Sequence, residues 1–247
     1  MTLSASANPP VPTTSSMPFW ELYRLVPSAV VGTTFASFVQ AAMSSMAMVF
    51  AIEAGMSTGK ATVFVGAGLT GAIFLQIPLG RLSDRFPRRI IILFCVFISA
   101  TIAGAQSLLS NSNDLHIFLN FLFGAFVFPL YGLFAALAND WIPSEKRISA
   151  SSTLVLASSS GAVVAPIVLG FLLGNFAPSS YFLANATVLT VIGVYISYRT
   201  RVREAVPVEK QSPFIPLVAR SGQIAHSLGR WIRNPLAVWP KEKSDQE

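Results

Sequence analysis

The sequence is short of charge. Of its 247 residues, 11% are charged and 53% are hydrophobic, whereas a soluble globular protein carries roughly 25% charged residues. So few charges cannot cover the surface of a dissolved protein of this size. Runs of 18 or more mostly apolar residues recur six times, and a helix of that length crosses ~30 Å of hydrocarbon. The composition therefore predicts an integral membrane protein of the helical kind.

Groups that catalyse reactions or bind metals are also scarce. Cys95 is the only cysteine, so no intramolecular disulfide can form, and the two histidines are His116, near the end of an apolar run, and His226. Neither histidine is placed to activate the serines at 158–160, and no apolar run holds a pair of aspartates. A phosphate-binding Walker loop and a Cys/His cluster are both missing. We expect no enzyme, no catalytic residue, no metal and no cofactor.

Six membrane spans are predicted, and helix is the open-chain structure that satisfies its own backbone in lipid. The connections after the first, third and fifth spans hold one basic residue, Lys60, while the other sixteen lie elsewhere. Cytoplasmic loops carry the excess of Lys and Arg, so both termini should face the cytoplasm. The same placement argues against nucleic acid as the partner of a chain with net charge +6. The spans are 26–52, 61–79, 90–109, 115–138, 149–173 and 180–198.

The two ends of the sequence are expected to lie outside the bundle. Residues 1–25 begin with a Ser-, Thr- and Pro-rich stretch without the basic start of a secretory signal, which predicts a disordered or linker segment. The basic tail, 199–247, is too polar to span. Two interpretations of this cytoplasmic tail stay open: an interfacial helix on anionic lipid, or a solvated chain broken by prolines.

A short charged turn separates the second and third spans and reads Gly80-Arg81-Leu82-Ser83-Asp84-Arg85-Phe86-Pro87-Arg88-Arg89. Gly80 permits close backbone approach, and Asp84 can pair with a nearby guanidinium. Such a cluster can hold helix ends together and release them when a bundle rocks. The plainer interpretation is an ordinary basic cytoplasmic loop in which Asp84 only balances charge.

The order of these residues resembles the loop motif of the major facilitator superfamily, G-x-L-[AS]-D-R-x-G-R-[RK]. Gly80, Asp84, Arg85, Arg88 and Arg89 match, and Pro87 stands where the family usually has glycine. The segment from Asn139 and Asp140 to Arg147 is similar to the acidic-Pro-Arg connection of the same transporters. The resemblance implies a cytoplasmic charge cluster of Asp84, Arg88 and Asp140 that stabilises one conformation. On physical grounds alone, Asp140 could equally be a solvated helix end.

The resemblance covers residues 19–200 and is most similar to the C-terminal half of a bacterial YcaD-like permease. It implies two inverted three-helix repeats forming one half-bundle, in a bacterial inner membrane, that transports a small molecule by alternating access. It also implies a second half-bundle as partner, either another copy or a separately encoded N-terminal half. The alternative is a non-transporting six-helix scaffold, or a truncated or split-gene half.

Polar side chains at membrane depth usually face the bundle interior, which predicts that Gln40, Ser44 and Ser45 of the first span lie inside. By analogy with the superfamily, the first and fourth spans of a half line the substrate pathway. The pathway candidates are therefore Gln40, Gln76, Phe128 and Tyr131. Simple aromatic packing is the alternative for Phe128 and Tyr131. No carboxylate lies deep in a span, so coupling to protons and uniport both stay open.

Overall fold

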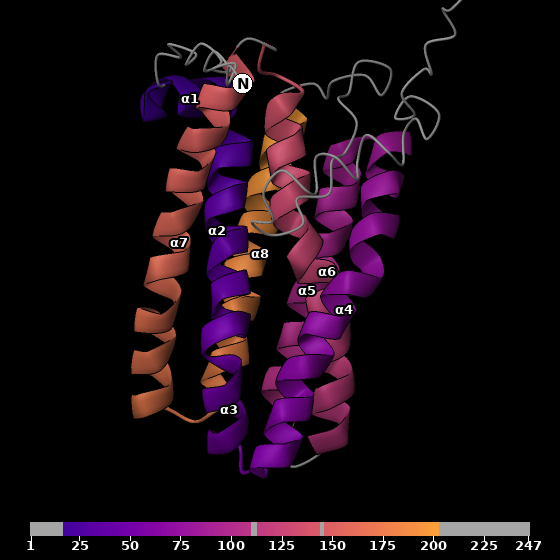
Figure 1. The fold of residues 1–247 in the computed structure, drawn as a ribbon, viewed down its shortest axis with the longest axis vertical. Coiled ribbons are helices and arrows are strands. Elements are labelled where there is room, and N and C mark those ends of the chain that lie inside the picture. The colour runs from indigo at the N-terminus through magenta and orange to yellow at the C-terminus, as the bar shows by residue number, and fades with distance from the viewer. Residues whose placement is uncertain (1–16, 110–112, 144–145, 203–247) are drawn as a thin grey trace, which may run out of the picture. The chain divides into compact units, whose positions relative to one another are not determined.

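The computed structural model describes residues 17–109, 113–143 and 146–202, all within one compact unit. In these ranges the regular structure is entirely helical, which confirms the predicted all-α class (Figure 1). The helices are α1 (Phe19–Leu25), α2 (Pro27–Ser45), α3 (Ala47–Glu53), α4 (Thr58–Arg85), α5 (Arg88–Leu108), α6 (Asn113–Asn139), α7 (Arg147–Asn175) and α8 (Ser180–Val202).

Five of these helices, α4 to α8, are long and apolar enough to cross a membrane. A sixth span arises if α1 and α2 count as one element, although the chain bends by 110° between them. The first predicted span, 26–52, is divided into α2 and α3 at Met46. Of the predicted linker 1–25, residues 19–25 form α1, while 1–16 and the tail from 203 onward lie outside the described residues.

Local chemistry explains where several helices begin and end. Pro27 occupies the first position of α2, where its missing N–H has no cost. α4 ends at Arg85 because Phe86 precedes Pro87 and is held in an extended conformation. α5 then begins directly after that proline. After α3, Gly55 adopts a φ of 80°, which only glycine reaches without strain.

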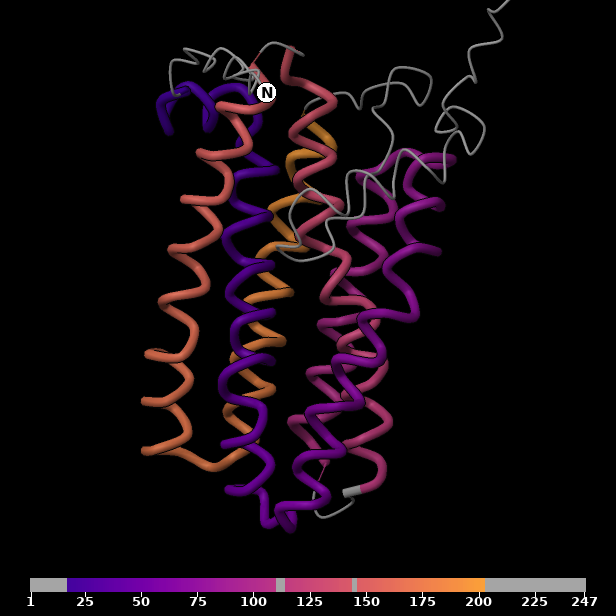
Figure 2. The backbone as a smooth tube through the Cα atoms, in the orientation of Figure 1, coloured from indigo at the N-terminus to yellow at the C-terminus, as the bar shows by residue number. Residues whose placement is uncertain are grey.

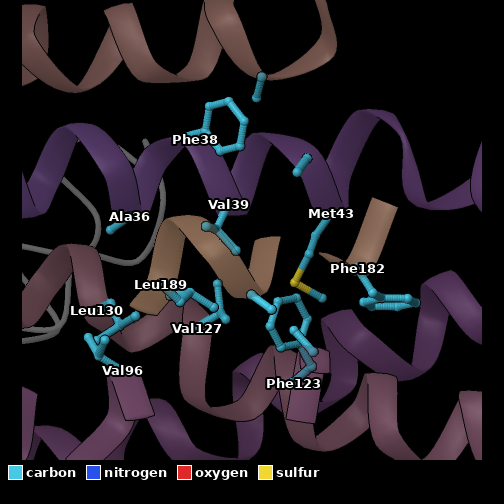
Figure 3. Packing of buried hydrophobic residues seen from close by; sticks show 14 of the residues in the cluster. Ala36, Phe38, Val39, Met43, Val96, Phe123, Val127, Leu130, Phe182 and Leu189 are labelled. Atoms are coloured by element: carbon cyan, nitrogen blue, oxygen red, sulfur yellow. The ribbon is translucent and has the colours of Figure 1, made fainter. Parts of the chain in front are cut away.

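The helices pack in pairs, as the backbone trace shows (Figure 2). α4 lies against α6, α2 against α7 and α5 against α8, while α2 and α6 also meet at the centre. The shared core is apolar and draws side chains from α2, α5, α6 and α8, among them Val39, Val96, Phe123 and Leu189 (Figure 3).

Glycines set the closest helix crossings. A Cβ built on Gly71 would overlap the carbonyl oxygen of Phe121, and one on Gly124 would overlap that of Gly68, so α4 and α6 touch through their backbones. Likewise, a Cβ on Gly161 would overlap the carbonyl oxygen of Thr34 and separate α7 from α2. Small residues allow this approach, as is usual between membrane helices.

Candidate functional site

A buried arginine joins three helices at one end of the bundle. Arg88, in the first turn of α5, donates from Nη1 to both carboxylate oxygens of Asp140, at 2.7 and 2.6 Å, just after α6. Its Nη2 lies 3.1 Å from Oδ1 of Asp84, one turn earlier on α4. The side chains of Arg88 and Asp140 are 0% and 1% exposed, and that of Asp84 is 35% exposed. One guanidinium thus links the ends of α4, α5 and α6 through two carboxylates.

The other residues of the motif have different surroundings. Gly80 is buried in α4, and its carbonyl accepts a 2.7 Å hydrogen bond from the buried Ser83 hydroxyl. Arg89 is also buried, whereas Arg85 and Arg147 are exposed. The Nε of Arg147 donates to the carbonyl of Ile142 at 3.3 Å and so closes the turn after α6. The sequence could not separate the buried arginines of this turn from the exposed ones.

The pathway candidates lie around the meeting of α2 and α6. The Gln40 amide donates to the carbonyls of Phe128 and Val127, at 3.0 and 3.3 Å, beside the proline within α6. Phe128 and Tyr131 are half-buried one turn apart. Gln76 is half-buried on the face of α4 that carries the buried Gly80. The structure therefore brings Gln40 and Phe128 into contact.

Ser44 and Ser45 do not face the bundle interior, and that prediction was wrong. Both are exposed, and their hydroxyls donate to the carbonyls of Gln40 and Ala41 in the preceding turn, at 2.9 and 2.6 Å. Bonding back to its own helix lets a serine satisfy its hydroxyl without a neighbouring helix. A serine at membrane depth therefore need not face the bundle interior, whereas the Gln40 amide bonds to carbonyls of another helix.

Sequence reasoning missed two interhelical contacts. The Asn120 amide of α6 donates to the Phe64 carbonyl of α4 at 2.8 Å, and the Thr34 hydroxyl of α2 reaches the Ala157 carbonyl of α7 at 3.1 Å. Both bonds lie at the glycine crossings described above. The signal available was the glycine pair three residues apart in α4, Gly68 and Gly71, because that spacing puts both on one helix face.

Charge divides the two ends of the bundle. The end with α1, the α4–α5 turn and the start of α7 carries every basic residue of the described ranges except Lys60. Lys60, at the opposite end, pairs with Asp114 at 3.1 Å on the surface. Within the described ranges, no group of three His, Cys, Asp or Glu side chains could hold a metal ion.

Apolar helices packed through small residues, with charge gathered at one end, define a multi-pass integral membrane protein. A family model described as Major Facilitator Superfamily matches residues 29–240. The chain belongs to the Major Facilitator Superfamily, a family of membrane transporters.

Two curated relatives match about half of the chain. An uncharacterized MFS-type transporter of Enterobacter sp. strain 638 is 28% identical over 126 residues, and the uncharacterized MFS-type transporter YcaD of Escherichia coli K12 is 29% identical over 126 residues. Each match covers 51% of this chain and 31% of the relative, so the matched segment spans less than a third of those proteins. The predicted resemblance to YcaD-like permeases is confirmed.

Two solved transporters share the fold. The POT family transporter PepTSo superposes with a TM-score of 0.67 at 17% identity, covering 90% of this chain and 44% of that one. An auto-inhibited POT family peptide transporter gives a TM-score of 0.64 at 17% identity, covering 89% of this chain and 43% of that one. At this identity the likeness concerns the fold alone, and the chain corresponds to less than half of each transporter.

Proposed function

We propose that this chain is one half of a transporter that moves a small molecule across a membrane by alternating access. The observation that carries the proposal is Arg88, buried between the carboxylates of Asp84 and Asp140 at the ends of three helices. A rocking bundle has to separate helix ends on the side that opens. A buried ion pair between those ends acts as a latch, because breaking it leaves charges unpaired. In this proposal Gly80, Arg85, Arg89 and Arg147 shape the turns around the latch.

The proposed topology has six spans, with α2 and α3 crossing together, and both termini in the cytoplasm of a bacterium whose inner membrane holds the chain. The proposed division of the chain is a linker segment (1–25), a six-span half-bundle (26–198) and a basic cytoplasmic tail (199–247). The basic residues at one end of the described bundle support the orientation.

Two inverted three-helix repeats, α2–α5 and α6–α8, complete the proposed architecture. In these repeats α4 corresponds to α7, and α6 corresponds to α2. The α4–α6 pair of helices therefore corresponds to the α7–α2 pair. Both pairs are the ones that cross through glycine, at Gly71 and at Gly161. This correspondence supports the repeats.

The proposed pathway runs beside α2 and α6 and is lined by Gln40, Phe128 and Tyr131, with Gln76 on α4. The amide of Gln40 already bonds to the Phe128 carbonyl, so a polar substrate could exchange with that bond. Its donor group and the two aromatic rings would then recognise a small, partly apolar molecule.

A second half-bundle is the proposed partner, since a cavity between halves needs both. α4 and α7 offer the faces for it. Ile73 and Phe74 of α4 are 76% and 69% exposed, and Leu156 and Phe171 of α7 are 72% and 63% exposed. The partner is either a second copy of this chain or a separately encoded N-terminal half.

Assembly is the first test. Native mass spectrometry in mild detergent should give a dimer with twelve membrane spans, or a complex with another six-span chain. A strict monomer would contradict the half-transporter and favour the scaffold alternative.

Side-specific labelling then tests alternating access. In sealed vesicles, Gln40→Cys should react with a membrane-impermeant maleimide from both sides, and Arg88→Leu should raise the rate from the cytoplasmic side. Ser151→Cys, exposed in the first turns of α7, is the control and should react from one side only. If Arg88→Leu leaves the cytoplasmic labelling rate of Gln40→Cys unchanged, the proposed latch is refuted.

A further inference from the structure

Helix α1 carries three aromatic residues that the bundle leaves partly uncovered. Phe19 and Trp20 are 44% and 66% exposed, and Tyr23 is half-buried. Their rings contact one another, with centroids 5.5 Å apart for Phe19 and Trp20, 5.9 Å for Trp20 and Tyr23, and 6.3 Å for Phe19 and Tyr23. The three residues therefore form one aromatic patch. Neither the Arg88 latch nor the proposed pathway uses it.

α1 lies across the end of the bundle and not along it. The chain turns by 110° between α1 and α2, as the first indigo helix in Figure 1 shows. The turn falls at Val26, which precedes Pro27 and is therefore kept out of the helical conformation. A helix at such an angle to a membrane span runs close to the plane of the membrane surface.

One face of α1 is fixed to the bundle. Leu22 is fully buried and packs with Met17 and with residues of α2, α6 and α7. The Met17 carbonyl accepts a 2.7 Å hydrogen bond from the Thr153 hydroxyl of α7, and Glu21 pairs with Lys146 at 3.0 Å. These contacts fix the rotation of α1 about its own axis, so the aromatic patch stays uncovered.

The other faces of α1 differ in polarity. Residues four apart share a face of a helix, so Phe19 lies beside Tyr23, and Trp20 lies beside Arg24. Glu21 lies about half a turn away from Phe19. An aromatic face, a mixed face and an acidic face thus follow one another around the helix. Interfacial helices have this pattern, with the aromatic face toward hydrocarbon and the charged face toward water.

A lipid surface is the partner that this position favours. α1 leads directly into α2, so the aromatic patch lies at the level where the proposed first span begins. Tryptophan and tyrosine collect where hydrocarbon meets water, because each has an apolar ring and one polar group. Arg24 is exposed beside Trp20, and a guanidinium is well suited to pair with lipid phosphates.

We propose that α1 is an interfacial anchor, with the aromatic patch in the boundary between lipid headgroups and acyl chains at the basic end of the bundle. The apolar face of such a helix enters this boundary by about 5–10 Å. Because Lys146 and Thr153 tie α1 to the start of α7, the anchor fixes the depth of the bundle in the membrane. The anchor is independent of the transport proposal, because it involves neither Arg88 nor Gln40.

Depth-dependent fluorescence quenching tests the anchor on the full chain in nanodiscs. Trp20 is kept as the only tryptophan, and Trp141, Trp231 and Trp239 are replaced by Phe. The phosphatidylcholine of the nanodisc carries bromine atoms either close to the headgroup or close to the ends of the acyl chains, and acrylamide quenches from water. Bromines close to the headgroup should remove most of the Trp20 emission. Bromines at the chain ends and acrylamide should each remove less.

Glu21→Trp, in a chain whose four native tryptophans are replaced by Phe, is the matched control. It places the indole on the acidic face of the same helix and removes a surface ion pair, since the Glu21 and Lys146 side chains are 47% and 58% exposed. Acrylamide should quench this indole more than either brominated lipid does. If the triple replacement does not fold, the difference in quenching between the parent chain and Trp20→Phe gives the same measurement.

Three results would overturn the anchor. Quenching of Trp20 by acrylamide alone places the aromatic patch in water. Quenching by neither agent shows that another protein segment or the second half-bundle covers the patch. Equal quenching patterns for Trp20 and for the Glu21→Trp indole show that the two faces of α1 do not differ in depth.

Discussion

Breaking the ion pair of Arg88 and Asp140 should cost far more stability than breaking the ion pair of Lys60 and Asp114 at the opposite end. The perturbation is a cycle of Arg88→Leu, Asp140→Leu and the double variant. Both side chains are fully buried, with N–O distances of 2.6 and 2.7 Å. Removal of one partner leaves the other charge buried and should cost about 3–5 kcal/mol. Replacement of both by leucine removes both buried charges, so the double variant should lose no more than either single one.

The control is Lys60→Ala. Lys60 and Asp114 form an ion pair of similar length, 3.1 Å, but their side chains are 48% and 89% exposed. Exposed pairs contribute about 0–1 kcal/mol, because water screens the charges in both states. The two ion pairs thus differ mainly in burial.

Thermal unfolding in detergent, followed by tryptophan fluorescence, measures the effect. At about 2–4 °C per kcal/mol for a chain of this size, each single leucine variant should melt about 6–20 °C lower, and Lys60→Ala within a few degrees of the parent. The reasoning is refuted if the Arg88 and Asp140 effects simply add in the double variant. It is equally refuted if neither exceeds the effect of Lys60→Ala.

Three further predictions follow from the packing. Gly161→Ala should destabilise the chain by about 1–3 kcal/mol, because its Cβ would overlap the Thr34 carbonyl oxygen. Gly170→Ala on the same helix has open space and should be neutral or stabilising. Equal melting temperatures of the two variants would contradict the α2–α7 crossing. Cys95 is fully buried and should react with maleimide only after unfolding, so rapid labelling of the folded chain would contradict its place in the core. Gln40→Leu should cost about 0.5–1.5 kcal/mol by chemical unfolding, because it removes the donor to the Phe128 carbonyl; an unchanged free energy of unfolding would show that this bond contributes nothing.

Hydropathy and turn chemistry are local properties, and the sequence predicted what depends on them. Few charges and repeated apolar runs predicted a helical membrane protein, and the structure has five helices long enough to span. A charged turn from Gly80 to Arg89 was predicted between two spans, and α4 and α5 meet there, at Phe86 and Pro87. The order of charges from Gly80 to Arg89 was enough to indicate the family, and the family match confirms it.

The tertiary structure alone decided which side chains meet. Four arginines lie between positions 81 and 89, and only the packing of α4, α5 and α6 shows that Arg88 lies between Asp84 and Asp140. A small pocket of the described bundle is lined by both Ser28 and Arg199, residues near opposite ends of the bundle sequence that no local pattern relates. Burial depends on the distances between helices, and glycine crossings such as Gly71 on Phe121 set those distances only once the helices have packed.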